Sequence, residues 1–258
     1  MNTTMNSYIS NLNRIEFIVT SACTGRCKHC SEGGNKGTGE HINGAIAADM
    51  VRKVASRYAI KSVMTFGGEP LLYPDDVCMI HSAARDAGIP LRQVITNGFF
   101  SSDEAKIKKV AADLAESGVN DLLLSVDAFH QEFIPIEPVI IFAKAALEVQ
   151  IPNFRVHPAW LAGRDADNPY NRKTHEIIAQ FREMGIPSSD GNVIFAAGNA
   201  LKYLSEYFDP DEEYENEYTE KQSDVVAISV KPNGDVLGGN IYKSDILDIL
   251  QNHTPDDE

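Results

Sequence analysis

Three of the protein's four cysteines, Cys23, Cys27 and Cys30, lie within eight residues. Thiolate is the metal-binding form of cysteine, and three thiolates on one loop repel each other unless a cation or cluster balances them. The spacing therefore predicts a metal centre rather than inert core thiols. A zinc site would need a fourth ligand, His29 or Cys78, and the second ligand pair of a zinc finger is missing. An iron–sulfur cubane on three cysteines leaves one iron open for chemistry.

Other residues able to do chemistry follow apolar runs that read as strands. Gly67, Gly68 and Glu69 follow one run, and the two glycines let a ligand approach the backbone closely. Further polar or turn-forming candidates follow later runs: Asn97, Ser125, Asp127, His130, Arg155 and His157. All of these candidates are predicted to gather at the carboxyl ends of strands, where parallel sheets bind ligands.

The elements that must position these residues alternate between strand and helix. We expect strands at residues 15–19, 62–66, 91–96, 122–126, 154–157 and 193–195, separated by amphipathic helices. Helical crossovers imply parallel pairing. A closed barrel needs two further strand–helix units. The predicted fold is therefore α/β, an open, partial (β/α)6 TIM-like barrel.

The C-terminal part has a different composition. Residues 209–224 are strongly acidic and are predicted to form a solvated loop. Residues 225–230 and 236–237 flank a turn-forming segment and are predicted to pair as a β-hairpin, and a short helix is expected at about 245–251. We therefore divide the chain into a core at 1–208 and an acidic loop with hairpin and helix at 209–258, packed on that core.

The C-x3-C-x2-C spacing and the Gly-Gly-Glu segment resemble the radical SAM superfamily, over roughly residues 14 to 200. The resemblance implies one [4Fe-4S] cluster on Cys23, Cys27 and Cys30, whose open iron binds S-adenosylmethionine. It also implies contacts to that cofactor: Gly67, Gly68 and Glu69 with the methionine amino group, Asn97 beside the pocket, Ser125 and Asp127 with ribose, Arg155 or His157 with the carboxylate, and His29 near adenine. Asp127 and His130 are alternatively predicted to face the substrate.

The implied reaction is reductive cleavage of S-adenosylmethionine to a 5′-deoxyadenosyl radical, which abstracts hydrogen from an unknown substrate. A flavodoxin- or ferredoxin-type reductant is implied. The predicted hairpin resembles the start of the SPASM auxiliary-cluster extension, which suggests a peptide or protein substrate, as in peptide maturation. No cysteine follows Cys78, so the chain alone cannot ligate a second cluster.

Three interpretations of the function stay open, and the first is a peptide-modifying enzyme. Only about fourteen residues precede the first expected strand, which leaves no room for a leader-binding domain and weakens the peptide interpretation. A glycyl-radical activating enzyme is a second radical SAM option. A noncatalytic zinc or iron–sulfur protein is the alternative from another class. Cys78, among apolar neighbours on an expected helix, is predicted to be a buried inert thiol.

Charge and the N-terminal sequence bear on location and partners. The chain has 37 acidic and 23 basic residues and a net charge of −14, which disfavours nucleic acid as a partner. We find neither a signal peptide nor an apolar run of about 18 residues that could span a membrane. A cytoplasmic protein is expected, because a reducing compartment preserves thiolate ligands.

Overall fold

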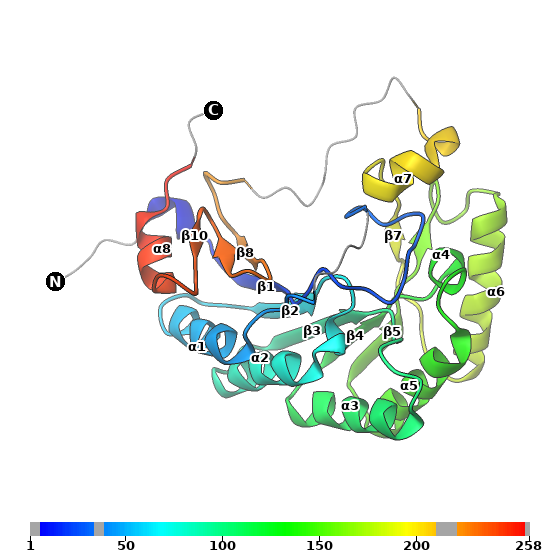
Figure 1. Ribbon diagram of the computed structural model, residues 1–258, viewed down its shortest axis with the longest axis horizontal. Coiled ribbons are helices and arrows are strands. Elements are labelled where there is room, and N and C mark those ends of the chain that lie inside the picture. Colours follow the sequence, from blue (N-terminus) through cyan, green and yellow to red (C-terminus); the bar gives the residue numbers. More distant parts are fainter. Residues whose placement is uncertain (1–5, 34–38, 210–220, 256–258) are drawn as a thin grey trace.

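The computed structural model describes residues 6–33, 39–209 and 221–255. A parallel six-stranded sheet forms its centre, in the order β5-β4-β3-β2-β1-β8. The strands are β1 (Arg14–Ile18), β2 (Ser62–Phe66), β3 (Leu91–Thr96), β4 (Asp121–Leu124), β5 (Asn153–Val156) and β8 (Ala227–Val230). The fold class is confirmed: the curved sheet and its helices match a partial TIM barrel (Figure 1).

Helices connect the strands and cover the convex side of the sheet (Figure 1). They are α1 (Gly44–Ala55), α2 (Pro74–Asp86), α3 (Glu104–Glu116), α5 (Ile136–Glu148) and α6 (Pro169–Glu183), with the short α4 (Ala128–Gln131) after β4. Alternation in β1 buries Ile15 and Phe17 completely, whereas Arg14 and Glu16 are half-buried on the opposite, concave side. One face of β1 thus builds the core while the other lies on the concave side.

The sixth strand of the main sheet differs from the prediction. Residues 192–193 form β7 (Asn192–Val193), which pairs with β6 (Ala159–Trp160) in a separate two-stranded parallel sheet. The place beside β1 is taken by β8, which the sequence analysis had assigned to a hairpin. Ile228 and Val230 of β8 are fully buried, so joining β1 extends the apolar core under the sheet.

The predicted pairing of 225–230 with 236–237 is therefore wrong. The C-terminal hairpin is shorter and lies later, between β9 (Asp235–Val236) and β10 (Gly239–Asn240). Leu237 and Gly238 turn the chain with φ of 45° and 74°, which is the geometry of a tight hairpin turn. Most of the acidic loop, residues 210–220, lies outside the described residues.

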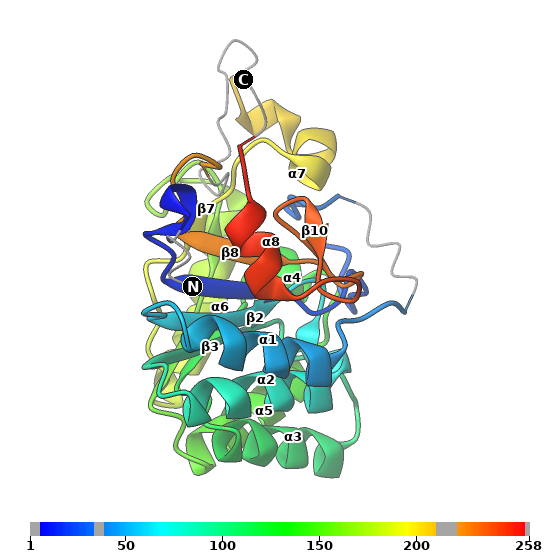
Figure 2. The ribbon, with the colours of Figure 1, turned by 90° about the vertical axis from the view of Figure 1, so that its left-hand side faces the viewer.

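The predicted terminal helix is α8 (Ile246–Asn252), capped by Asp245, whose side chain accepts from the Leu247 amide. Figure 2 shows α8 beside the N-terminal segment. The Asn6 side chain joins them by donating to the Leu250 and His253 carbonyls at 3.0 and 2.7 Å. Within the ranges described, no helix is long and apolar enough to span a bilayer.

Candidate cofactor site

The cysteine loop, residues 20–30, packs directly on the glycines after β2. The amides of Gly68 and Glu69 donate to the carbonyls of Thr20 and Ala22 at 2.7 and 2.8 Å. A Cβ on Gly68 would stand 2.1 Å from the Ala22 oxygen, and Gly67 adopts φ +141° against Thr20. These glycines are thus required by the close approach of the cysteine loop itself, a reason that the sequence did not reveal.

Glu69 joins the ends of β2 and β3 from a fully buried position. Its carboxylate accepts from Thr96 Oγ1 at 2.7 Å, from the Asn97 amide at 2.8 Å and from the Leu71 amide at 2.9 Å. Burial raises the pKa of Glu69 to about 7, although these hydrogen bonds act in the opposite direction. The side chain is therefore a structural link at this edge, and its contact with the methionine amino group stays a prediction.

Asn97 connects β3 to the cysteine loop. Its Nδ2 donates to Cys23 Sγ at 3.5 Å and to Thr24 Oγ1 at 3.1 Å, while its Oδ1 accepts from the Phe99 amide at 2.8 Å. Asn97 thus contacts the cysteine loop, and its predicted place beside the cofactor pocket stays a prediction. Thr24, which sequence reasoning missed, is the second partner.

The three cysteines are free thiols in a desolvated position. Cys27 is buried, and Cys23 and Cys30 are half-buried. Burial raises the pKa of Cys23 to about 11 and raises that of Cys27 further, with added repulsion from the neighbouring thiols. Three thiolates can therefore persist here only beside compensating positive charge. The donor set fits a three-cysteine iron–sulfur cluster, with the Gly25 amide as an additional donor to Cys23 Sγ at 3.3 Å.

Two histidines pack next to Cys27. The ligand atoms of Cys27, His29 and His130 lie within 4.8 Å of one another, which is close enough for an alternative zinc site. The His29 ring lies 5.0 Å from Phe129 and 4.8 Å from His130, between ring centroids, and burial lowers the pKa of His29 to about 4. A neutral imidazole packed among rings agrees with the predicted nonligand role, and its contact with adenine stays a prediction.

Asp127 is not available to ribose, which corrects the prediction. The side chain is fully buried, and its oxygens accept from the amides of Phe129, His130 and Ala159 and from His130 Nδ1, at 2.8–3.0 Å. Burial alone would raise its pKa, but His130 and its hydrogen bonds hold the pKa below the usual range. Asp127 caps α4 and orients His130.

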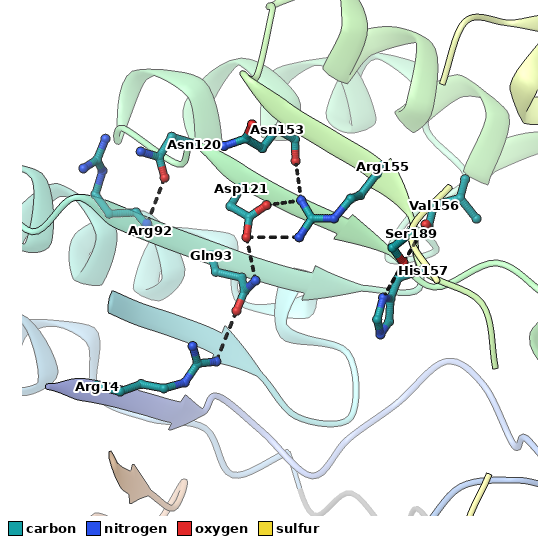
Figure 3. A network of polar contacts seen from close by, with 10 residues as sticks. All are labelled: Arg14, Arg92, Gln93, Asn120, Asp121, Asn153, Arg155, Val156, His157 and Ser189. Atoms are coloured by element: carbon teal, nitrogen blue, oxygen red, sulfur yellow. Dashed lines mark hydrogen bonds and ion pairs between the residues drawn. The ribbon is translucent and has the colours of Figure 1, made fainter. Parts of the chain in front are cut away.

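Arg155 is also directed away from the predicted ligand position. Its guanidinium forms an ion pair with Asp121 at the start of β4 and therefore points away from the carboxyl edge (Figure 3). His157 does lie just past β5, where its Nδ1 contacts Ser189 Oγ at 2.8 Å, and burial lowers its pKa. Ser125 lies just past β4, with its amide bound to the Thr96 carbonyl. Of the contacts predicted after β4 and on or after β5, His157 and Ser125 remain at this edge.

A polar network crosses the concave face below this edge. Arg14 donates to Gln93 at 3.1 Å, Gln93 donates to Asp121 at 2.5 Å, and Asp121 accepts from Arg155 (Figure 3). On the other side Arg14 and Ser229 both donate to Glu16. We call this set the concave network: Arg14, Glu16, Gln93, Asp121, Arg155 and Ser229. The sequence contained a signal for this network. Strands of a parallel sheet are usually apolar on both faces, whereas these strands have polar residues at alternate positions.

A second anchor of the cysteine loop comes from α7 (Gly198–Tyr203). The Asn199 amide donates to the Cys30 carbonyl at 2.9 Å, and its Nδ2 donates to the Cys27 carbonyl at 3.1 Å. The approach is so close that a Cβ on Gly198 would meet the Ser31 oxygen at 2.1 Å. Sequence analysis missed this contact, because Asn199 is more than 160 residues beyond the loop that it holds.

Cys78 lies on α2, outside the site. Burial raises its pKa to about 11, although a hydrogen bond with Ser117 opposes this effect. Cys78 is half-buried rather than buried as predicted, and its inertness stays a prediction.

Comparison with family models identifies one family, which matches more than half of the chain. The model described as the Radical SAM superfamily matches residues 17–195. A GTP 3′,8-cyclase of Vibrio parahaemolyticus is 31% identical over 125 residues, which is 45% of this chain and 36% of that protein. A probable GTP 3′,8-cyclase of Methanocaldococcus jannaschii is 25% identical over 150 residues, 55% and 48% of the two chains. The chain thus spans at most about half the length of these relatives.

Solved structures share the fold at low identity. SuiB of Streptococcus suis bound to its precursor peptide SuiA matches with a TM-score of 0.56 and 14% identity, over 94% of this chain and 65% of that one. The enzyme anSMEcpe, solved with AdoMet and the Cp18Cys peptide, matches with a TM-score of 0.58 and 15% identity, over 94% and 81%.

Proposed function

The chain belongs to the radical SAM superfamily, and from this premise we propose that it abstracts a hydrogen atom from a peptide or protein substrate bound over the concave face. It is a radical S-adenosylmethionine enzyme that uses a [4Fe-4S] cluster and S-adenosylmethionine. The observation that carries the assignment is the cysteine loop, whose three desolvated thiols are held between the Gly67–Glu69 turn, Asn97 and Asn199.

The residues divide the work in this proposal. Cys23, Cys27 and Cys30 hold the cluster, and the Asn97 amide offsets charge on Cys23. The bound cofactors supply one-electron cleavage of a carbon–sulfur bond and a carbon radical that removes hydrogen. Ser125 and His157 are the side chains that we assign to S-adenosylmethionine, since both lie at the carboxyl edge with the cysteine loop.

The charge balance of the concave network bears on the substrate. Arg14 is paired with Glu16 and Arg155 with Asp121, so neither arginine of this network is left unpaired for a polyphosphate. This disfavours a nucleoside triphosphate, although the curated relatives are named GTP 3′,8-cyclases. Backbone amides and mixed side chains of a peptide suit such a dipolar surface. The peptides named in the SuiB and anSMEcpe structures add support by analogy of fold.

Two further parts of the proposal concern the electron donor and the cellular location. A flavodoxin- or ferredoxin-type protein supplies the electron, and the chain works in the cytoplasm, where free thiols survive. A glycyl-radical activating enzyme would be a special case of this proposal, because its substrate is itself a protein.

Anaerobic reconstitution with iron and sulfide tests the cofactor assignment. We expect one [4Fe-4S] cluster per chain and formation of 5′-deoxyadenosine after addition of dithionite. Binding of zinc with S-adenosylmethionine left intact would contradict the assignment and favour the noncatalytic metal protein.

The substrate class needs a separate experiment. In peptide pools deuterated at carbon, hydrogen abstraction transfers deuterium into 5′-deoxyadenosine, which mass spectrometry detects. GTP serves as the matched alternative substrate. Deuterium transfer from labelled GTP and not from peptides would overturn the peptide proposal while leaving the radical SAM assignment intact.

A further inference from the structure

Asp127 and His130 form a buried pair that the proposed function leaves without a role. The Asp127 side chain is fully buried, and 15% of the His130 side chain is exposed. Asp127 Oδ1 accepts from the amides of Phe129 and His130 at 2.9 and 3.0 Å. Its Oδ2 accepts from the Ala159 amide at 3.0 Å and from His130 Nδ1 at 2.8 Å. Protein donors thus occupy both oxygens, so Asp127 acts on a ligand only through its charge or through His130.

The pair lies beside the cysteine loop. One ring nitrogen of His130 lies within 4.8 Å of Cys27 Sγ, and the other side of the contact is the hydrogen bond from His130 to Asp127. The His130 ring therefore lies between the Asp127 carboxylate and the sulfur of a cluster ligand. Phe129 and Ala159, whose amides donate to Asp127, belong with Cys27 to one cluster of buried apolar residues. The carboxylate and the sulfur thus share one dry environment.

Little solvent screens Asp127 from Cys27. Cys27 is only 6% exposed and Asp127 is not exposed at all, and a charge acts more strongly in such an interior than in water. Burial raises the pKa of the Cys27 thiol, and the Asp127 charge raises this pKa further, ahead of the neighbouring thiols of Cys23 and Cys30. The Asp127 carboxylate therefore acts electrostatically on the Cys27 sulfur.

The same electrostatics apply to a cluster on this sulfur. Reduction adds one negative charge to an iron–sulfur cluster, and the reduction potential depends on the charges and hydrogen bonds around its sulfurs. A fixed carboxylate beside Cys27 makes this addition less favourable and lowers the potential. The His130 ring has the opposite effect, because a donor bound to the carboxylate offsets part of the negative charge that Cys27 experiences.

We propose that the Asp127–His130 pair sets the reduction potential of the cluster bound to Cys27: Asp127 lowers the potential, and His130 limits the decrease. This rests on the cofactor assignment in the proposed function. The step concerned is the gain of one electron by the cluster from an external reductant, with no bond made or broken. A lower potential makes the reduced cluster a stronger reductant. Neither residue contacts the reacting atoms, so both are positioning residues.

The test measures the midpoint potential of the reconstituted protein and its variants, by titration with titanium(III) citrate followed by EPR. Asp127→Asn removes the charge and keeps an oxygen that accepts from the two α4 amides. Asp127→Ser is a second variant, because its hydroxyl also caps a helix. His130→Leu removes the ring that donates to Asp127. The matched control is Asp121→Asn, the same change at a buried carboxylate at the opposite end of β4.

We expect the Asp127 variants to favour reduction about tenfold, which is a rise of about 59 mV for a one-electron couple. His130→Leu should shift the potential in the opposite direction, and Asp121→Asn should leave it unchanged. The opposite signs are the diagnostic result. A purely structural role would loosen the same site in both kinds of variant and shift both potentials in one direction.

An unchanged or lower potential in the Asp127 variants, shifts of one sign at Asp127 and His130, or an equal shift in Asp121→Asn would each overturn the proposal. Loss of cluster assembly in both Asp127 variants would overturn it as well, since the pair would then be required for assembly. Failure of the proposed function is distinct: the unmodified protein would form no [4Fe-4S] cluster, or its reduced cluster would leave S-adenosylmethionine intact.

Discussion

The carboxyl edge of the sheet and the concave network are both polar, yet they are held together by different forces. At the edge, backbone amides and carbonyls of the Gly67–Glu69 turn and the cysteine loop bond to each other, with no room for a Cβ. In the concave network, charged and polar side chains of five strands bond to one another, and all of them except the buried Asp121 remain partly exposed. The edge therefore depends on shape, and the network depends on charge.

This difference predicts that substitutions at the edge abolish cofactor binding, whereas substitutions in the network change stability and substrate selection. Four experiments test the comparison.

The largest effect is expected from Cys27→Ala. Loss of one of three ligands should prevent assembly of the cluster and abolish formation of 5′-deoxyadenosine. Cys78→Ala is the matched control and should leave iron content and activity unchanged, because Cys78 lies on α2 outside the site. Retention of activity in Cys27→Ala would sink the cluster assignment.

Gly68→Ala tests the dependence of the edge on shape. The new Cβ would stand 2.1 Å from the Ala22 oxygen, and we expect the free energy of unfolding to fall by about 2–3 kcal/mol, with reduced iron incorporation. Gly88→Ala is the control: its φ is +75° but no atom lies within 4 Å of the added Cβ, so roughly 1 kcal/mol is expected. Urea denaturation compares the two. Equal losses would show that crowding at Gly68 is unimportant.

Asp121→Asn tests the dependence of the concave network on charge. It removes the partner of Arg155, and since the arginine is partly exposed we expect a loss of about 1–2 kcal/mol in the free energy of unfolding. Cluster content and dithionite-driven cleavage should remain normal. A matched change in the exposed Lys109–Asp113 pair, Asp113→Asn, should have no measurable effect. Loss of the cluster in Asp121→Asn would contradict the separation of the two regions.

The last experiment measures a pH dependence at the edge. Folding raises the pKa of Glu69 from 4.5 to about 7, so the folded protein binds more protons than the unfolded chain between these values. The contribution of Glu69 to stability is therefore full below pH 4.5 and is lost as pH rises toward 7, at about 1 kcal/mol per pH unit. Urea denaturation of the apoprotein and of Glu69→Gln measures the difference.

Buried His81 has the opposite sign, because burial lowers its pKa to about 3 and its contribution is lost as pH falls below 6.5. That background is common to the apoprotein and to Glu69→Gln, and it cancels in their difference. A difference that does not change with pH between 4.5 and 7 would rule out the raised pKa of Glu69.

Most of the barrel could be predicted from the sequence, because each strand and helix has a local pattern. Five of the six predicted strands form the main sheet, and β8 replaces the sixth. The error had a physical cause: residues 225–230 look the same whether they pair with a neighbouring hairpin arm or with β1, since alternation does not specify the partner.

Within the site, agreement between the predicted and the observed role of a residue depended on the kind of contact that was predicted. The cysteines and Asn97 were found because spacing and strand ends are local features. Asp127 and Arg155 were assigned to a ligand, but each has an internal partner, His130 and Asp121 respectively. A carboxylate or guanidinium can satisfy its charge within the protein or on a ligand, and sequence alone cannot distinguish these two uses.

The sequence by itself determined the three candidate cluster ligands, the order of strands β1 to β5 and the absence of cysteines for a second cluster, because these depend on residue type and spacing. Tertiary structure alone decided why Gly67 and Gly68 must lack side chains, which strand closes the sheet beside β1, and how Asn199 holds the cysteine loop. Each of these depends on contacts between segments far apart in the chain, whose pairing is set by packing of the whole core.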